Sequence, residues 1–323
     1  MLKDLQLQAH LNADAEDKMS KPRMYQYSPL AGADSIRLII LQPGAPGSDI
    51  HCSLIHNTLT ELRDDIYQHY TALSYVWGDA SKSREVFVDH QSFQATINLA
   101  AALDDLRHHK NVLRLWADAI CIDQSDISER NHQVGLMREI YSLAQHTVIH
   151  LGETNEECNK VLHTALQGKL DSQSMKLAVD QVLSRPWLSR VWIYQELVLS
   201  KDPWIQCGRT RIRWDVFYTA FLADEEERWW RNSETPTINL DLVSPHQAGP
   251  IEVFSGMHAA RKGKPPTLLS VMVSRRGFGA SNPRDLVYGH LAVARLPSKR
   301  NVPSCPVVDY QQSIIEVFTE ATT

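Results

Sequence analysis

Two acidic side chains lie in strongly apolar segments of the sequence, where an ionised group is costly. Glu196 lies in the stretch Pro186–Ser200, which we expect to form one buried helix, and it follows Trp192 by four residues, so the two side chains share a helix face. Burial raises the pKa of a carboxyl group and suits it to acid/base chemistry. The alternative is a structural glutamate that pairs with Arg190 or Arg130.

The second acidic residue, Asp118, interrupts the apolar run Val112–Ile122. A buried carboxylate needs hydrogen-bond donors, so Asp118 either caps neighbouring backbone amides or contacts a ligand hydroxyl. Cys121 lies near the end of the same run and is either a nucleophile or a small core thiol. Because the local sequence holds no histidine near it, we favour the core thiol.

The segments around these residues alternate between strand-like and helix-like patterns. A helix opens at Asn98, another covers Glu129–Ala144, and helical patterns follow over Glu156–Leu183 and Pro186–Ser200. The order β-α-β-α-β predicts a doubly wound α/β core. We expect three runs to be neighbouring parallel strands, with a possible fourth at Trp204–Cys207: Tyr70–Tyr75, Arg114–Ile120 and Val148–His150.

Outside this core the sequence predicts a hairpin and a helical end. The runs Ser35–Leu41 and Ile50–Ile55 flank a Pro/Gly turn cluster, and Glu85–Asp89 is a short extended piece. The polar residues 1–24 form an arm, residues 25–232 the α/β domain, and residues 233–323 a mostly helical region that begins with the Pro/Ser/Thr-rich linker Ser233–Pro250. The chain stops inside the amphipathic pattern Ile314–Ala321, so we expect a longer protein. Four segments of the C-terminal region have helical patterns: Val253–Lys262, Leu268–Arg276, Asp285–Ala294 and Ile314–Ala321.

Ligands of open α/β sheets bind beyond the carboxyl ends of the strands, which directs attention to the loops there. Trp77-Gly78 ends one strand, and Trp77 either stacks on a ligand ring or fills the core, while Gly78 is needed for the turn. Glu129 we assign to capping the next helix. Arg130 and Gln133 point to the crevice if that helix begins near Ser128, where they contact a phosphate or a partner.

Composition and motif content exclude several classes of function. The 323 residues carry a formal charge of −5 and are 43% hydrophobic, which is typical of a folded protein and argues against nucleic-acid or anionic-membrane binding. No membrane span or secretory signal is evident, so we expect a cytoplasmic protein with reduced cysteines. Phosphate-loop, dinucleotide-fingerprint, nucleophile-elbow and zincin motifs are absent, and the histidines do not predict a metal site.

Three segments, in order and spacing, resemble the fungal heterokaryon-incompatibility (HET) domain. They are Tyr70–Asp79 (YTALSYVWGD), Leu115–Gly152 and Arg185–Glu196 (RPWLSRVWIYQE), and two later motifs, Asn282–Tyr288 and Val308–Tyr310, resemble the region that follows this domain in such proteins. The resemblance covers about residues 24 to 320. It implies a fungal, cytoplasmic protein of the programmed-cell-death type.

The HET domain is itself considered similar to the TIR domain, a flavodoxin-like signalling module, and some TIR domains cleave NAD. The resemblance therefore implies a TIR/flavodoxin-like doubly wound parallel sheet with N-terminal β-hairpin additions and a mostly helical C-terminal region. The TIR pattern of a Trp followed by a catalytic Glu is similar to Trp192 and Glu196. The insertion between Gly152 and Pro186, the extra Glu85–Asp89 piece and the helical C-terminal half have no counterpart in a minimal TIR domain.

We accordingly expect a crevice that binds NAD or a related nucleotide as substrate, with no resident cofactor or metal. Its residues are Trp77, Gly78, Asp118, Arg130, Gln133 and Trp192 for binding and Glu196 for catalysis. Partners are expected to be further copies of the chain and signalling proteins. Two alternatives stay open, a non-catalytic oligomerising signalling module and a HET-like fold recruited to small-molecule metabolism.

Overall fold

The computed structural model describes residues 23–65, 67–168, 170–221, 250–263, 265–294 and 306–322. Almost all of the expected N-terminal arm, the linker Ser233–Pro250 apart from its last residue, and Cys305 lie outside these residues. The proposed division at residues 25–232 and 233–323 is left as a prediction. Within the described part of the chain, no helix is both long and apolar enough to cross a membrane.

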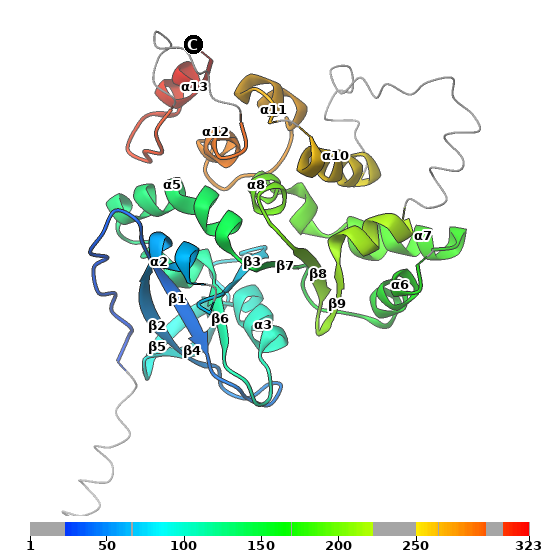
Figure 1. Cartoon of the computed structure of the whole chain (residues 1–323), viewed down its shortest axis with the longest axis horizontal. Coiled ribbons are helices and arrows are strands. Elements are labelled where there is room, and N and C mark those ends of the chain that lie inside the picture. The colour runs from blue at the N-terminus through cyan, green and yellow to red at the C-terminus, as the bar shows by residue number, and fades with distance from the viewer. Residues whose placement is uncertain are drawn as a thin grey trace, which may run out of the picture.

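A single mixed sheet of nine strands organises the fold (Figure 1). Its order is β5-β4-β2-β1-β6-β3-β7-β8-β9. The strand bounds are β1 Ser35–Leu41, β2 His51–Thr58, β3 Thr71–Tyr75, β4 Ser83–Val88, β5 Gln91–Thr96, β6 Leu113–Trp116, β7 His146–His150, β8 Pro203–Cys207 and β9 Thr210–Arg213.

The centre of the sheet is parallel, as the sequence predicts. β3 pairs in parallel with β6 on one side and with β7 on the other, and β8 extends this set beyond β7. The predicted hairpin is also confirmed, since β1 and β2 are antiparallel neighbours. However, β1 runs antiparallel to β6, and antiparallel pairs complete both ends. The nine strands therefore form one mixed sheet, whereas a doubly wound parallel sheet with hairpin additions was expected.

Helices cover both faces of the parallel centre. The connection from β3 to β6 contains β4, β5 and then α3 (Ile97–Leu106). Helix α5 (Ile127–Leu143) lies in the connection from β6 to β7, which runs in the opposite direction across the sheet. Right-handed crossovers place two such helices on opposite faces, and Figure 1 shows α3 and α5 on opposite sides of the strands. Both crossovers bring the chain back so that β3, β6 and β7 all end at one edge.

Three expected elements are interrupted. The run Val112–Ile122 is a strand only to Trp116, after which Asp118–Cys121 forms the short helix α4, because the Asp118 carboxylate accepts the Ala119 amide (2.8 Å) and favours a helical turn. The predicted helix at Pro186–Ser200 is a 3-10 turn, Pro186–Ser189, followed by α8, Ile193–Val198. The pattern Glu156–Leu183 divides into α6 (Glu156–Leu166), α7 (Ser172–Ala178) and a π-helical turn, Val179–Leu183.

Helix α3 begins at Ile97 with Thr96 as its N-cap, so Asn98 is not the capping residue. The side chain of Asn98 instead donates to the Val76 carbonyl (3.0 Å). The sequence reasoning also missed α2 (Leu59–Asp64) and the strands β5 and β9.

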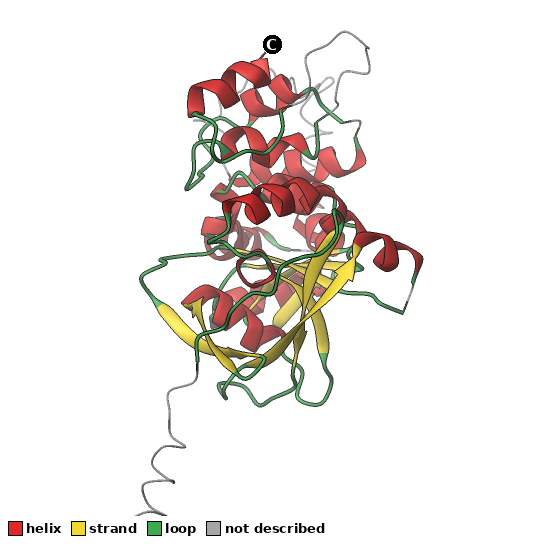
Figure 2. Ribbon diagram, turned by 90° about the vertical axis from the view of Figure 1, so that its left-hand side faces the viewer, coloured by secondary structure: helices red, strands yellow, loops and turns green. Residues whose placement is uncertain are grey.

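The C-terminal region is helical, as expected. It contains α10 (Pro250–Lys262), α11 (Leu268–Ser274), α12 (Asp285–Leu291) and α13 (Ile314–Thr322). These helices form a layer beyond α5 and α8, so that α5 and α8 lie between them and the sheet (Figures 1 and 2). Helix α8 contacts α5, α10 and α12.

Candidate functional site

The loops that follow β3 and β6 meet at the carboxyl edge of the sheet. Trp77 follows β3 and Asp118 follows β6, and the indole Nε1 of Trp77 donates to Asp118 Oδ2 at 2.8 Å. The other Asp118 oxygen accepts the Ala119 amide. Two of the predicted site residues are therefore in direct contact. Asp118 accepts a backbone amide, as one of its two expected roles requires, and its contact with a ligand stays a prediction.

Glu196 lies beside the same strand ends. It is only 2% exposed and accepts a hydrogen bond from the hydroxyl of Ser74 on β3. The Ser74 hydroxyl accepts in turn from the indole Nε1 of Trp187 at 2.7 Å. A chain of three side chains, Trp187–Ser74–Glu196, thus fixes the carboxylate against the sheet. Ser74 and Trp187 escaped the sequence analysis, because nothing local marks a strand serine or a helix tryptophan as a partner of a distant glutamate.

The environment of these carboxylates changes their acidity. Burial raises the pKa of Glu196 to about 6, and the negative charge of Asp118 adds to this, while Arg190 and the Ser74 hydrogen bond act in the opposite direction. Burial also raises the pKa of Asp118, again against Arg190 and the Trp77 donor. The two carboxyl groups are electrostatically coupled, although they are separated by 78 positions in the chain (196 − 118).

Tyr75 contributes a buried phenol to this site. Its side chain is 2% exposed, and its hydroxyl lacks a well-directed hydrogen bond in the described structure. Burial, and then the nearby Asp118 charge, raise the pKa of this phenol well above its ordinary value. The Tyr75 hydroxyl also interacts with the Asp118 carboxylate as a hydrogen-bond donor, so Tyr75 and Asp118 form a buried polar pair next to Glu196.

Arg190 is the cation that these carboxylates share. Its guanidinium donates to the Tyr75 carbonyl, and its charge lowers the pKa values of Asp118, Glu196 and Asp285. One expected alternative was that Glu196 interacts with an arginine. The structure supports such an interaction with Arg190, through its charge. Arg130 acts on Asp285 instead.

Two other predicted residues of the crevice, Arg130 and Trp192, belong to a neighbouring cluster around Asp285. The Arg130 guanidinium lies 4.4 Å from the centre of the Tyr310 ring, and the Tyr310 hydroxyl donates to Asp285 Oδ1 at 2.7 Å. Burial raises the pKa of Asp285, which Tyr310, Trp192 and Arg130 counteract. Asp285 and Tyr310 were not among the predicted site residues, yet both lie in the two C-terminal motifs that carry the HET resemblance.

Two predicted binding residues have structural roles. Gln133 is fully buried, and its amide donates to the Ser35 carbonyl at 2.8 Å. Gly78 has φ +78°, and a Cβ there would lie 2.6 Å from the Asn98 side chain, so Gly78 shapes the turn. These contacts leave the binding roles of both residues untested.

Cys121 and Glu129 also have structural partners. Cys121 is fully buried, and burial raises the pKa of its thiol to about 12, as expected of a core thiol and not of a nucleophile. Glu129 lies in the first turn of α5, as expected of an acidic residue that stabilises the start of a helix, but it is not the N-cap. Asp126 caps α5, whereas the Glu129 carboxylate pairs with the buried Arg37 at 2.6 Å and accepts the Asp123 amide.

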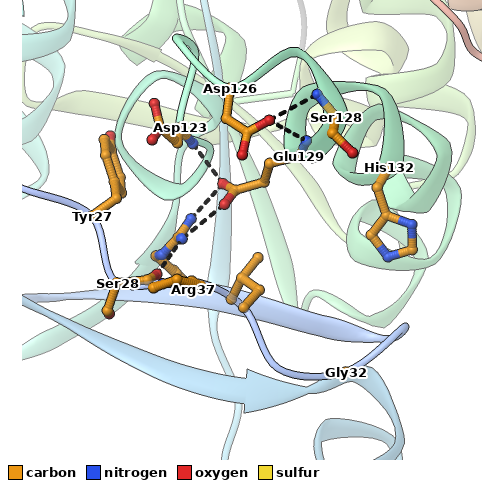
Figure 3. A pocket seen from close by; sticks show the side chains of 11 residues that line it. Tyr27, Ser28, Gly32, Arg37, Asp123, Asp126, Ser128, Glu129 and His132 are labelled. Atoms are coloured by element: carbon orange, nitrogen blue, oxygen red, sulfur yellow. Dashed lines mark hydrogen bonds and ion pairs between the residues drawn. The ribbon is translucent and has the colours of Figure 1, made fainter.

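A polar cavity of about 310 Å³ lies away from Glu196, between the segment Tyr27–Gly32 and the start of α5 (Figure 3). The Arg37–Glu129 pair lies at its wall, and Asp123, Asp126 and His132 complete its polar lining. None of the predicted binding residues lines this cavity. Within the described ranges, no group of three or more His, Cys, Asp or Glu side chains could hold a metal ion.

Comparison with known proteins finds a family match over the central part of the α/β core. The family model described as "Heterokaryon incompatibility protein (HET)" matches residues 70–196, which run from the start of β3 to Glu196. The chain is therefore similar to HET-domain proteins over residues 70–196.

One curated relative is "Heterokaryon incompatibility protein 6, OR allele" of Neurospora crassa, which is 27% identical over 96% of this chain and 55% of its own length. The chain therefore spans about half the length of this relative. No solved structure matches the chain.

Proposed function

We propose that this protein acts in heterokaryon incompatibility and that its HET domain binds NAD or a related nucleotide and hydrolyses the bond to nicotinamide with the help of Glu196. The first part is supported by the HET family match and by the name of the Neurospora relative. The second part is supported by the TIR-like spacing of Trp192 and Glu196, since in the TIR pattern the Glu is the catalytic residue. Loss of NAD or its product would then drive the cell-death response.

One observation carries the catalytic proposal: Glu196 is a buried carboxylate, held by Ser74, whose pKa is raised to about 6. At pH 7 a group with this pKa is still about nine-tenths ionised. Cleavage of a glycosidic bond to nicotinamide develops positive charge on the ribose, which a fixed carboxylate in a low-dielectric site stabilises. The Trp187–Ser74–Glu196 chain supplies the preorganisation that such stabilisation requires.

The neighbouring groups suit the rest of a nucleotide. In this proposal the Tyr75 hydroxyl and the Asp118 carboxylate, which interact with each other in the structure, contact ribose hydroxyls, because the charges of Asp118 and Glu196 act on each other and on Tyr75. Arg130 contacts a phosphate, and Trp192 provides an aromatic surface near it. Self-association and signalling partners would couple this activity to the incompatibility reaction.

The test measures release of nicotinamide from NAD by the purified chain over a wide range of protein concentrations, so that activity that depends on assembly is detected. Glu196→Gln keeps the side-chain volume and removes the charge, so the rate should fall by at least about a hundredfold. The matched control is Glu139→Gln, because Glu139 is a half-exposed acid that pairs with Arg63 on the surface.

Full NAD cleavage by a folded Glu196→Gln variant would show that Glu196 is not the catalytic group. If the parent chain released no nicotinamide at any concentration, the non-catalytic oligomerising module would become the better description. Binding of NAD without cleavage, measured by calorimetry, would separate a nucleotide sensor from both.

A further inference from the structure

Residues beyond the HET domain enclose the helix that carries Glu196. The backbone of Gly279 pairs with the turn before α8, since the Gly279 amide donates to Ser189 O (2.6 Å) and the Val191 amide donates to Gly279 O (3.0 Å). Arg261 of α10 donates to the Ser200 carbonyl just after α8 at 2.9 Å. The C-terminal region therefore holds both ends of α8, and α10 and α12 contact this helix.

A short part of that region, residues 306–313, lies directly on the Arg130 side of the site, and we call it the Tyr310 segment. Asn131 holds it with both ends of its amide, because Nδ2 donates to Asp309 Oδ1 (3.0 Å) and Oδ1 accepts the Tyr310 amide (3.0 Å). The Tyr310 ring covers the Arg130 guanidinium at 4.4 Å, and its hydroxyl is bonded to Asp285. The segment is thus fixed to α5 and to α12.

The Tyr310 segment places an aromatic ring and a carboxylate where Arg130 and Asn131 present their donors. These are the same features that a ring-bearing anionic ligand offers. However, the Tyr310 ring does not satisfy the Arg130 guanidinium, since its Nε is buried without a hydrogen-bond partner in the described structure. A guanidinium normally forms hydrogen bonds with a carboxylate or phosphate, so a ring over it leaves part of its binding capacity unused.

The Arg130 cluster and the helix of Glu196 are in contact, because Trp192, the residue before α8, packs in one apolar cluster with Tyr288 and Tyr310, and α12 contacts α8. The charge of Arg190 acts on both Asp285 and Glu196. We infer that the Tyr310 segment is an intramolecular inhibitor that occupies the Arg130 end of the site and, with α12, keeps Glu196 closed to an anionic nucleotide. The inference rests on the proposed function for the identity of the nucleotide, but the closure itself is independent of it. In this arrangement, release of the segment is what makes the site accessible.

Three variants test this closure. Tyr310→Ala removes the ring from Arg130 and the hydroxyl from Asp285, and Tyr310→Phe removes only the hydroxyl. Asn131→Ala removes the two hydrogen bonds between α5 and the Tyr310 segment and leaves the residues of the segment unchanged. It replaces Tyr310→Ala in the test if that variant does not fold. The matched control is Gln311→Ala, because the Gln311 side chain is exposed on the same segment.

Two measurements need no nucleotide. Hydrogen exchange over residues 306–322 reports release of the segment, and carbodiimide-driven labelling of Glu196, read by mass spectrometry, reports access to the site. Tyr310→Ala and Asn131→Ala should raise both rates by at least about fivefold, the lower range of coupling between two sites, with Tyr310→Phe intermediate and Gln311→Ala at the parent's value. NAD binding and cleavage should rise in the same order.

Unchanged labelling of Glu196 in a folded Tyr310→Ala or Asn131→Ala variant would overturn the closure, whatever happens to NAD. Increased labelling without any NAD binding or cleavage, in the parent or the variants, would support the closure and reject NAD as the ligand. Increased labelling together with weaker NAD binding would show that the segment helps to build the site and would overturn its inhibitory role.

Discussion

The indole of Trp77 donates a 2.8 Å hydrogen bond to the carboxylate of Asp118, and this bond joins the ends of β3 and β6. Because the strands are parallel neighbours, both residues leave the sheet at the same edge. Glu196 reaches this edge from α8 through Ser74 of β3. The candidate site is therefore organised around the carboxyl end of β3, with contributions from β6 and α8.

Replacing Asp118 by Ala should lower the free energy of unfolding by about 1–3 kcal/mol, because the Trp77 indole and the Ala119 amide both lose their acceptor. Denaturant unfolding measures this. A double-mutant cycle with Trp77→Phe isolates the bond, and we expect a coupling energy of about 1 kcal/mol. If Asp118→Ala is as stable as the parent, the hydrogen bonds of Asp118 make no net contribution to stability, and the Trp77–Asp118 contact does not hold the two strand ends together.

Glu196 makes the stability depend on pH in a defined direction. Its pKa is raised from 4.5 to about 6 in the folded protein, so between these values the folded state binds more protons than the unfolded state. The contribution of Glu196 to stability is therefore greatest below pH 4.5 and falls as the pH rises through 6, by about 2 kcal/mol in total.

The measurement is the free energy of unfolding from pH 4 to 7 for the parent and for Glu196→Gln. The Gln variant lacks this titration, so the difference between the two proteins should change by that amount across the interval and then level off. A difference that stays constant with pH would mean that Glu196 titrates with its ordinary pKa.

Arg37 should be the most costly charge to remove from the N-terminal part of the fold. Its side chain is fully buried, pairs with Glu129, and donates to the carbonyls of Ser28 and Cys121. Arg37→Met leaves the Glu129 carboxylate unpaired and should reduce the free energy of unfolding by about 3–5 kcal/mol. Adding Glu129→Gln should recover part of this loss.

The control is Arg63→Met, since the Arg63–Glu139 pair lies on the surface with both side chains about half exposed. That change should cost less than about 1 kcal/mol. Equal effects of Arg37→Met and Arg63→Met in thermal or denaturant unfolding would contradict the structural role of the buried pair.

Gly78→Ala should destabilise the turn after β3 by about 1–3 kcal/mol, because φ +78° is strained for alanine and the new Cβ meets the Asn98 side chain. Gly135→Ala is the opposite case. Gly135 lies in α5 with open space at its Cβ position, so alanine there should stabilise the protein by up to about 1 kcal/mol. Calorimetric melting of both variants checks the pair, and a Gly78→Ala variant that melts with the parent would remove the argument from backbone strain.

Local sequence patterns predicted the structure correctly where the residues of a segment themselves favour one type of secondary structure. Apolar runs identified β3, β6, β7 and β8, the Pro/Gly cluster identified the β1–β2 hairpin, and helical periodicity identified α5 and the C-terminal helices. Patterns were misleading where two tendencies compete over a few residues. At Asp118 the side chain captures a backbone amide and ends the strand early, and at Arg190 the chain pairs with Gly279 in place of continuing a helix.

The sequence by itself determined the similarity to HET-domain proteins, the parallel centre of the sheet and the presence of acidic groups at its carboxyl edge, because these follow from residue types at fixed spacing. Only the tertiary structure decided which groups meet. Ser74 and Trp187 hold Glu196, Arg190 faces three carboxylates, and Asp285 and Tyr310 come from the C-terminal region to cover Arg130. The contacts of Ser74 with Glu196 and Trp187, and of Tyr310 with Arg130, join residues more than a hundred positions apart, so they depend on how strands and helices pack and leave no signature in the local sequence.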